Sequence, residues 1–290
     1  MISIVICSVS PEQLSRVKAN IQETIGLPYE IVAIDNRRNP RGITTVYNEG
    51  ARKSQYEQVC FVHEDVQFNT AGWGKVLLDH FKDPELGLVG VAGATHKPKM
   101  LSGWGAQGLA LRYAKMNFIQ HFPASGLAPA HQYQNSENEE LAQVACLDGL
   151  FLATKKSIIE EIPFDENLLK GFHGYDMDIS IAIGRKYKVA VTYCILVEHF
   201  SGGSLNKEWL ESALLIHRKW RHVLPVSLSA ISKKEKAICE KETFRFVLNI
   251  LFPHFSVKKA LRVLHMGELR SLDFFTYMKM YLSIGKAYFS

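Results

Sequence analysis

Apolar residues in the first third of the chain form nearly continuous runs, separated by segments in which they recur at helical spacing. The runs Ile2–Val9, Tyr29–Ile34 and Val59–Val62 are typical of buried strands. Between the first two, apolar residues from Leu14 to Ile25 recur every three or four positions, and Ser10-Pro11 offers a capping residue before a proline at the first helical position. This order of strand, helix and strand predicts a parallel sheet and an α/β fold.

The same patterns continue through the middle of the chain, with one interruption. Further strands are predicted at residues 87–93, 146–153 and 189–197, and further helices around residues 47–51, 73–81, 155–163, 175–183 and 209–220. Residues 94–144 show no regular period and are rich in Gly, His, Pro and Gln, so we expect an irregular segment. Connections of this length are usually functional or disordered, and a substrate cover, a partner interface and a plain insertion all remain open.

The C-terminal residues have a different charge balance from the rest. Residues 231–290 carry 11 Lys and Arg against 5 Asp and Glu, whereas residues 1–230 carry 23 against 24. We predict a domain at residues 1–225 and a helical extension at 226–290, with helices over Lys233–Leu251, Val257–His265 and Leu269–Tyr288. Basic and aromatic residues mix in this extension, so residues 232–290 could touch a membrane surface peripherally, pack as a helical cap or form a homodimer.

Composition limits the remaining classes. A chain of 290 residues with 47% hydrophobic residues can bury a large core, and no apolar run reaches the roughly 18 residues of a membrane span. The N-terminus lacks the basic region of a signal peptide, so we expect a cytoplasmic protein, with the inner face of the membrane as an alternative. The five cysteines are scattered without a C-x-x-C pair, which favours reduced thiols over a zinc site. A nearly neutral body does not suggest nucleic-acid binding.

One predicted strand ends in groups that can bind a cation. The run ending at Phe61-Val62 is followed directly by His63, Glu64 and Asp65. Ligands of open α/β sheets bind outside the carboxyl ends of the strands, although a strand followed by a solvated turn would look the same. Alternate residues of an extended chain face opposite ways, so Glu64 should point away from the other two. No G-x-G-x-x-G follows the first strand, so a dinucleotide site lacks its main signature.

A second set of motifs follows in the later half of the chain. Asp148-Gly149 precedes a strand, Phe164-Asp165-Glu166 follows a helix, and Gly174-Tyr175-Asp176-Met177-Asp178 opens another helix. His199 ends the last predicted strand. Carboxylates at a helix N-terminus are favourable by about 0.3–1 kcal/mol through the helix dipole, so simple capping is the alternative for both aspartates of the helix.

The order of all these motifs resembles the inverting glycosyltransferases of family 2, over roughly residues 1–222. The resemblance also includes Asp35 at the end of the second strand and the Asn48-x-Gly50 pair on the next helix. It implies the GT-A fold, a Rossmann-like, mixed and mainly parallel sheet flanked by helices, here with a C-terminal helical extension.

The resemblance also implies roles for the residues that would bind the donor and a metal. Asp35 resembles the aspartate that contacts the donor base, and Asn48 belongs to the same nucleotide-binding half. Asp65 resembles the last member of the Asp-x-Asp motif, which holds a divalent metal, Mn²⁺ or Mg²⁺. His63 stands in place of the first aspartate and could contact the nucleotide. His199 resembles the histidine that completes the metal site in some relatives, and a structural histidine is its alternative.

Three further carboxylates are candidates for the chemistry. Asp176 resembles the catalytic base of the family's paired acidic signature, with Tyr175 in place of the first acidic member. Asp178 is the rival base. Asp148 and Asp178 would contact the acceptor or the donor sugar, although Asp148 could also simply pair with a basic neighbour.

The predicted function is therefore that of an inverting, metal-dependent glycosyltransferase. It would move a sugar from a nucleoside diphosphate sugar, with a UDP-sugar as the first candidate, to a hydroxyl of a glycan or a lipid-linked acceptor. An alternative is a module of the same fold that recognises nucleotide sugars or glycans without catalysis. A metal-dependent phosphohydrolase using the same carboxylates is a third.

Overall fold

The computed structural model describes residues 1–203 and 205–289, Phe289 by its backbone alone. The chain forms two compact units. Unit 1 comprises Met1–Gly93 with Lys115–Gly203, and unit 2 comprises Ala94–Ala114 with Ser204–Ser290. The predicted domain boundary between residues 225 and 226 stays a prediction, because compact packing does not define which part carries an activity.

Unit 1 contains a seven-stranded sheet in the order β10-β13-β5-β12-β3-β1-β2. Its strands are β1 (Ile2–Ser8), β2 (Tyr29–Asp35), β3 (Gln58–Val62), β5 (Leu86–Gly90), β10 (Leu141–Gln143), β12 (Phe151–Lys155) and β13 (Lys188–Thr192). β1 is parallel to both β2 and β3, and β13 is parallel to β5. β12 runs antiparallel between β3 and β5, and β10 is antiparallel to β13. This mixed sheet confirms the predicted α/β class.

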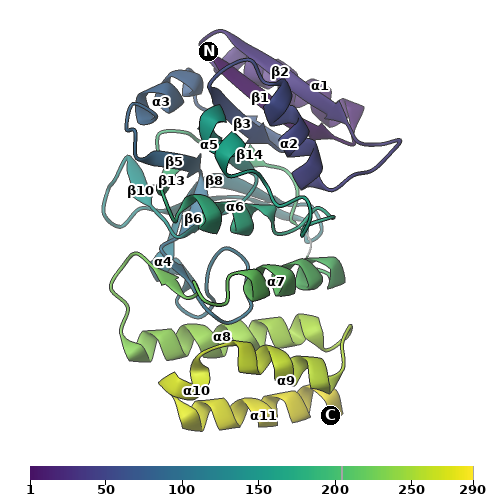
Figure 1. Cartoon of the computed structure of the whole chain (residues 1–290), viewed down its shortest axis with the longest axis vertical. Coiled ribbons are helices and arrows are strands. Elements are labelled where there is room, and N and C mark those ends of the chain that lie inside the picture. The colour runs from purple at the N-terminus through teal and green to yellow at the C-terminus, as the bar shows by residue number, and fades with distance from the viewer. Residues whose placement is uncertain (204, 290) are drawn as a thin grey trace. The chain divides into compact units, whose positions relative to one another are not determined.

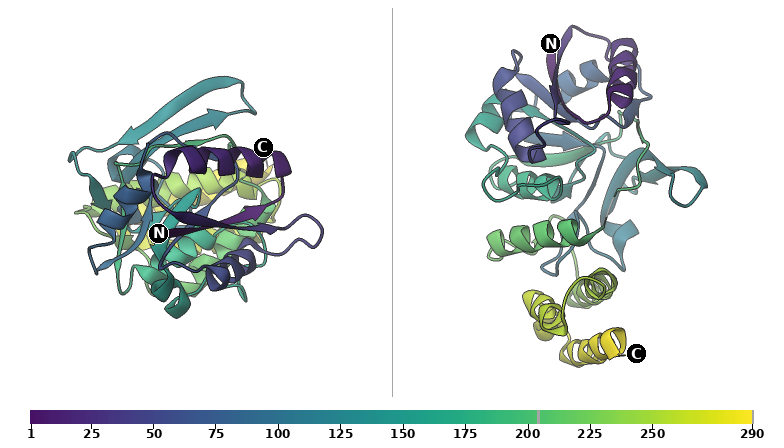
Figure 2. Two further views of the ribbon diagram at one scale, coloured as in Figure 1. Left: turned by 90° about the horizontal axis from the view of Figure 1, so that it is seen from above. Right: turned by 90° about the vertical axis from the view of Figure 1, so that its right-hand side faces the viewer.

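A second sheet of unit 1 has the order β11-β6-β8-β14-β4, with β9 paired to β8. Its strands are β4 (Val66–Phe68), β6 (Ala92–Ala94), β8 (Ala114–Phe122), β9 (Leu127–Gln134), β11 (Cys146–Leu147) and β14 (Val197–His199). The expectation that residues 94–144 are irregular is therefore wrong, because β8 and β9 form a long antiparallel hairpin, which Figure 2 shows in blue-teal.

β8 has no recognisable sequence pattern because its buried positions are partly polar, and β9 has none because no residue of it is buried. Asn117 is 5% exposed and donates through Nδ2 to the carbonyl oxygens of Tyr193 and Ile195 at 2.9 and 3.1 Å. The buried Lys115 ammonium pairs with a carboxylate oxygen of Glu139 at 3.0 Å. Polar side chains with such partners can be buried in a strand at little cost. They interrupt the pattern of apolar residues from which a strand is predicted.

Three strands that were predicted as single elements are each divided between the two sheets. Residues 87–93 contribute to β5 and β6, residues 146–153 to β11 and β12, and residues 189–197 to β13 and β14. The segment from β3 to β4 passes between the sheets in the same way. Apolar runs on both sides of each crossing explain why the sequence suggests a continuous strand.

Helices flank the sheets of unit 1, as Figure 1 shows. They are α1 (Pro11–Thr24), α2 (Ile43–Lys53), α3 (Trp73–His80), α5 (Lys156–Glu161) and α6 (Tyr175–Ile183). Ser10 caps α1 by accepting from the Gln13 amide, and Pro11 begins the helix, as predicted. α2 packs on β1 and β2, and α6 packs against β5, β11 and β13. A Cβ on Gly50 would lie 2.2 Å from Cγ1 of Val5, so this glycine lets α2 approach β1.

Unit 2 is mainly helical and contains α4 (Ala110–Tyr113), α7 (Lys207–Lys219), α8 (Lys233–Leu251), α9 (Val257–Met266), α10 (Leu269–Leu272) and α11 (Phe274–Phe289). The short strands β7 (His96–Lys97) and β15 (Val226–Ser227) pair antiparallel. α8, α9 and α11 pack on one another, and α10 packs on α8 and α11 (Figure 1).

The prediction of one helix over Leu269–Tyr288 is wrong, because the chain leaves the helical conformation at Asp273. Its carboxylate accepts from the backbone amide and the hydroxyl of Thr276 at 2.9 and 2.6 Å, so it begins a new helix. Across residues 1–203 and 205–289, no helix has both the length and the apolar composition required to span a bilayer.

Candidate metal and active site

Strand pairing brings residues that are distant in the sequence to one point of unit 1. His63 follows the last residue of β3, and Asp65 precedes the first residue of β4. β14 runs antiparallel to β4 in a register that sets His199 opposite Val66. The Phe200 amide donates to the Asp65 carbonyl at 3.0 Å and extends this pairing. The local backbone therefore fixes His199 beside Asp65.

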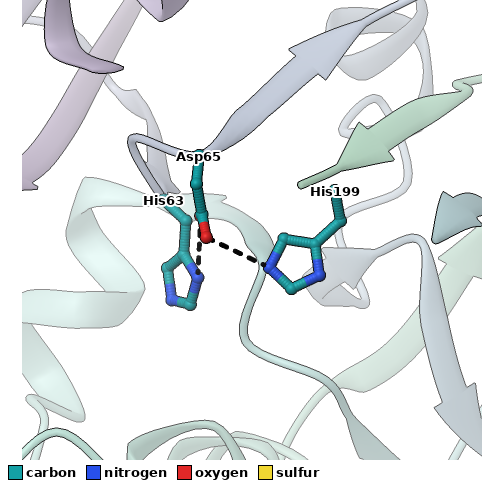
Figure 3. Close-up of side chains that lie close together, drawn as sticks. All are labelled: His63, Asp65 and His199. Carbon is teal, nitrogen blue, oxygen red and sulfur yellow. Dashed lines mark ion pairs between the residues drawn. The ribbon is translucent and has the colours of Figure 1, made fainter. Parts of the chain in front are cut away.

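The three side chains converge, as Figure 3 shows. Oδ1 of Asp65 lies 3.8 Å from Nδ1 of His63, and Oδ2 lies 3.6 Å from Nε2 of His199. One ligand atom from each residue lies within 4.8 Å of the others. All three side chains are 11–16% exposed, so the cluster is shielded but open to solvent.

Hydrogen bonds fix the tautomer of His63. The hydroxyl of Tyr175 donates to the Gly149 carbonyl oxygen at 2.9 Å, so its oxygen accepts from Nε2–H of His63 at 2.6 Å. In the neutral ring Nδ1 is then unprotonated, and its lone pair faces Asp65. A Cβ on Gly149 would lie 2.2 Å from the Tyr175 hydroxyl oxygen, so only glycine allows this contact.

The electrostatic surroundings keep His63 neutral. Burial is the main cause that lowers the pKa of His63, and His199 lowers it further. The carboxylates of Asp65 and Asp148 act in the opposite direction without reversing the shift. A neutral ring with Nδ1 unprotonated is the form that can donate a lone pair to a metal ion.

A second set of hydrogen bonds orients His199. Nε2 of Gln120 donates to the carbonyl oxygens of His121 and Ser201, each at 2.6 Å, which fixes Oε1 as the acceptor end of the amide. Nδ1–H of His199 therefore donates to Oε1 of Gln120 at 3.2 Å. Nε2 of His199 is left with its lone pair directed toward Asp65 and toward the Ser201 hydroxyl, which lies 3.2 Å away.

Two imidazole lone pairs thus face one carboxylate across gaps too long for hydrogen bonds. Metal bonds to histidine nitrogen or carboxylate oxygen are about 2.0–2.2 Å long, so two ligands of one ion lie about 3 to 4.4 Å apart. The distances of 3.6 and 3.8 Å from Asp65 fall in this range. Both histidines also have the hydrogen-bond partner on the second nitrogen that metal-binding histidines usually have. The residues therefore fit a divalent cation.

Two of the predicted carboxylates, Asp148 and Asp176, lie near this cluster. Tyr175 and Asp176 are the first two residues of α6, and Asp178 is buried one position beyond Met177. Oδ1 of Asp148 accepts from the Leu150 amide at 3.0 Å. Burial is the largest cause that raises the pKa of Tyr175, and the charges of Asp176 and Asp148 add to it. The negative charges of Asp148 and Asp176 therefore disfavour ionisation of the Tyr175 hydroxyl, which is the hydrogen-bond partner of His63.

Two predicted donor-binding residues have other partners. Asp35 is half exposed, and its carboxylate accepts from Nε and Nη2 of Arg37 at 2.9 and 2.7 Å, which lowers its pKa. Asn48 is 5% exposed, and its amide donates to the Phe164 carbonyl oxygen and accepts from the Phe164 amide at 2.9 and 3.1 Å. The structure does not bring either side chain into the His63 cluster, and their donor contacts stay predictions.

Glu64 points away from His63 and Asp65, as its position in the strand predicts. Its Oε1 accepts from the backbone amides of Val9 and Ser10 at 3.0 and 2.9 Å. The carboxylate therefore holds the turn between β1 and α1.

Sequence reasoning missed three contributors to the site. Gln120 and Ser201 lie in segments without a recognisable motif, and their contacts with His199 appear only in the folded chain. The ring of Phe172 lies beside that of His63, tilted by 40° with ring centroids 5.4 Å apart, although the Phe172 side chain is largely exposed. A signal existed only for Phe172, which lies two positions before the helix-opening motif.

Comparisons with known proteins place this site in a family. A family model described as "Glycosyltransferase like family" matches residues 3–212. A crystal structure of GalNAc-T7 with UDP, GalNAc and Mn²⁺ is similar with a TM-score of 0.53 at 10% identity, covering 99% of this chain and 58% of that chain. A crystal structure of A197 from STIV has a TM-score of 0.37 at 13% identity, covering 69% of this chain and 85% of that one. No curated protein sequence matches.

The likeness to the GalNAc-T7 structure shows the fold, and it agrees with the GT-A architecture expected from the motifs. This chain spans 58% of the length of that structure. The family model covers well over half of the chain, including both histidines and all of the candidate carboxylates. The chain therefore belongs to the glycosyltransferase-like family.

Proposed function

We propose that the protein is an inverting, metal-dependent glycosyltransferase that moves a sugar from a nucleoside diphosphate sugar to a hydroxyl acceptor. The observation that carries this proposal is the pair of histidine lone pairs directed at Asp65. His63, in the variant His-Glu-Asp motif, would hold the metal together with Asp65 and His199.

Mn²⁺ is the proposed metal and Mg²⁺ the alternative, because two imidazoles favour a transition metal over a hard cation with oxygen ligands. When bound, the metal would neutralise charge that develops on the diphosphate leaving group. The GalNAc-T7 structure contains UDP and Mn²⁺, which supports a UDP-sugar as the donor. Asp35 is the proposed contact for the donor base, with Asn48 shaping the same half of the site.

Asp176 is the proposed general base. It stands at the second position of α6, one residue from Tyr175, whose hydroxyl contacts the metal-site histidine. An acceptor hydroxyl that attacks the sugar must lose its proton, and a positioned base contributes about 10²- to 10⁴-fold to such a step. Asp148 and Asp178 would contact the sugar or the acceptor.

The base assignment is tested with Asp176→Asn, with Asp178→Asn as the matched comparison on the same helix. Asp176→Asn should retain binding of UDP and Mn²⁺, measured by calorimetry, and lose at least about 100-fold in sugar transfer. Transfer at the wild-type rate would refute the role of Asp176. If Asp178→Asn alone abolished transfer, Asp178 would be the base.

The second candidate is a module that recognises nucleotide sugars or glycans without transferring them. Tyr175 favours it, because a tyrosine engaged with His63 and Gly149 replaces the first acidic residue of the signature. Titration of UDP-sugars with Mn²⁺, followed by chromatography for free UDP, distinguishes the two. Binding with neither transfer nor donor hydrolysis would favour the module.

The proposed acceptor is a glycan or a lipid-linked sugar. A peripheral membrane contact of residues 232–290 is supported by apolar side chains on α11, where Phe275 is 81% exposed and Leu282 is 68% exposed. A homodimer through the same face is the alternative. Sedimentation with and without vesicles separates these proposals.

A further inference from the structure

Unit 2 contains a cavity of about 520 Å³ that none of the roles above uses. It lies at the end of α7, where the following turn, α9 and the segment after β7 meet. We call it the basic pocket; its lining residues are Lys99, His217, Arg218, Arg221, His222, Leu224, Arg262 and Met266. Its volume is typical of sites that bind small molecules.

Four of the lining side chains carry a permanent positive charge. They are Lys99, Arg218, Arg221 and Arg262. Within residues 1–203 and 205–289, none of the four forms an ion pair with a carboxylate. Arg221 instead donates through Nε to Nε2 of His222 at 2.8 Å. Four positive charges from three segments therefore meet at one cavity without carboxylate partners.

The excess of positive charge lowers the pKa of a neighbouring lysine. The pKa of Lys259 is lowered, first by burial and then by the charges of Arg218 and Arg262. Glu211 is the carboxylate that acts in the opposite direction, and it does not cancel the shift. The electrostatic potential at this end of α9 is therefore positive.

A neutral histidine forms the back of the basic pocket. His217 is 2% exposed, donates through Nδ1 to the Ala213 carbonyl oxygen at 2.8 Å, and accepts at Nε2 from the buried Nζ of Lys97 at 3.1 Å. Lys97 also donates to the carbonyl and hydroxyl oxygens of Ser102 at 3.2 and 2.5 Å. Burial lowers the pKa of His217, so the back of the basic pocket is a neutral imidazole whose second nitrogen is held by Lys97.

We propose that the basic pocket binds the phosphate or diphosphate group of a phosphorylated ligand. Arginine forks match phosphate oxygens in pairs, and four cations suit a group that carries two or three negative charges. Leu224 and Met266 add an apolar patch that accommodates the carbon part of such a ligand. The group can come from a soluble phosphate ester or from the headgroup of an anionic lipid, which present the same chemistry.

Inorganic pyrophosphate is the probe for the site, titrated by calorimetry into the full chain with EDTA present. EDTA removes any metal, so the result is independent of the His63 cluster and of the proposed transferase activity. Wild type should bind one pyrophosphate. The double variant Arg218→Gln/Arg262→Gln should bind at least about 100-fold more weakly, since each lost charged hydrogen bond typically costs about tenfold or more. Both side chains are exposed at the rim, so folding should be unaffected.

Lys258→Gln is the matched control, because Lys258 is exposed on α9 and does not line the cavity. It should change the affinity by less than about twofold, as expected for a surface charge. The absence of saturable binding to wild type would overturn the proposal. An equal loss in the control and the double variant would do the same, because it would mean diffuse attraction to a basic surface.

The source of the phosphate is separated in a second experiment. Glycerol 3-phosphate and vesicles of phosphatidylcholine with phosphatidic acid are each tested against wild type and the double variant. Vesicle binding that the double variant loses, and that pyrophosphate displaces, assigns the basic pocket to a lipid headgroup. Binding of glycerol 3-phosphate with unchanged vesicle binding assigns it to a soluble ester. If the double variant binds both ligands as well as wild type does, the proposal is wrong.

Discussion

Removing a single oxygen atom at Tyr175 should weaken metal binding without touching a metal ligand. In Tyr175→Phe, Nε2–H of His63 loses its acceptor and the Gly149 carbonyl oxygen loses its donor, contacts of 2.6 and 2.9 Å. Neither group regains a partner easily, since Tyr175 is 3% exposed. His63 is then free to adopt the other tautomer, in which Nδ1 carries the proton and cannot bind a metal.

The size of the effect follows from these contacts. Loss of hydrogen-bond partners behind metal-binding histidines typically costs 10- to 100-fold in metal affinity, and we expect a loss in this range for Mn²⁺. The free energy of unfolding should fall by about 1–3 kcal/mol, because a buried polar group is left without a partner. Calorimetric titration with Mn²⁺ measures the first quantity, and urea unfolding in EDTA measures the second.

Tyr47→Phe is the matched control. Tyr47 is fully buried with its ring centroid 5.5 Å from that of Tyr175, and its hydroxyl interacts with that of Tyr175. Tyr47→Phe removes a hydroxyl next to Tyr175 but leaves the acceptor of His63 in place, so Mn²⁺ affinity should fall much less than in Tyr175→Phe. Equal Mn²⁺ affinities for wild type and Tyr175→Phe would refute the argument that Tyr175 sets the tautomer of His63.

Three further predictions concern residues behind the site and in unit 2. Glu64→Ala should lower the free energy of unfolding by about 2–3 kcal/mol in urea, because two amides lose a charged acceptor, and an unchanged midpoint would contradict this role. Asn48→Ala should cost a similar amount, because the backbone of Phe164 loses two partners, and the proposed nucleotide contact also predicts weaker donor binding per folded molecule; unchanged donor affinity would leave Asn48 a purely structural role. Burial raises the pKa of Glu240 from 4.5 to about 7, so the folded chain holds this proton more tightly than the unfolded chain. The free energy of unfolding of wild type should therefore fall by up to about 3 kcal/mol as the pH rises from about 4.5 to 7, relative to that of Glu240→Gln. If wild type and Glu240→Gln show the same dependence on pH, the assignment is wrong.

The sequence predicted the elements whose burial comes from apolar residues. β1, α1, β2 and β3 follow from their runs and spacing, and each appears at the expected place. β8 was missed because burial there depends on paired polar groups, such as Lys115 and Asn117, whose partners come from other segments, and β9 was missed because none of its residues is buried. The side-chain period cannot reveal a strand of this kind.

Of the three proposed metal ligands, the sequence pointed to Asp65 and His199 and gave His63 a nucleotide contact, and it did not reveal their supports. His63 and Asp65 are neighbours in the sequence, and the order of motifs joined His199 to them. The roles of Tyr175 and Gln120 depend on distances across the folded chain, since each contacts a histidine more than seventy positions away. Contacts between residues so far apart in the chain produce no local pattern in a single sequence.

The crossings between the two sheets explain why the site lies where it does. His63 to Asp65 form the crossing from β3 to β4, and Asp148 lies in the crossing from β11 to β12. At each crossing the backbone leaves the hydrogen bonds of one sheet before it joins those of the other. Side chains in the crossing can therefore point toward the site, while the strands on both sides fix the backbone position. His199 is fixed by pairing with β4 and with β8, opposite Val66 and Gln120. The second sheet, half of which the sequence did not reveal, therefore sets the geometry of the His63, Asp65 and His199 cluster.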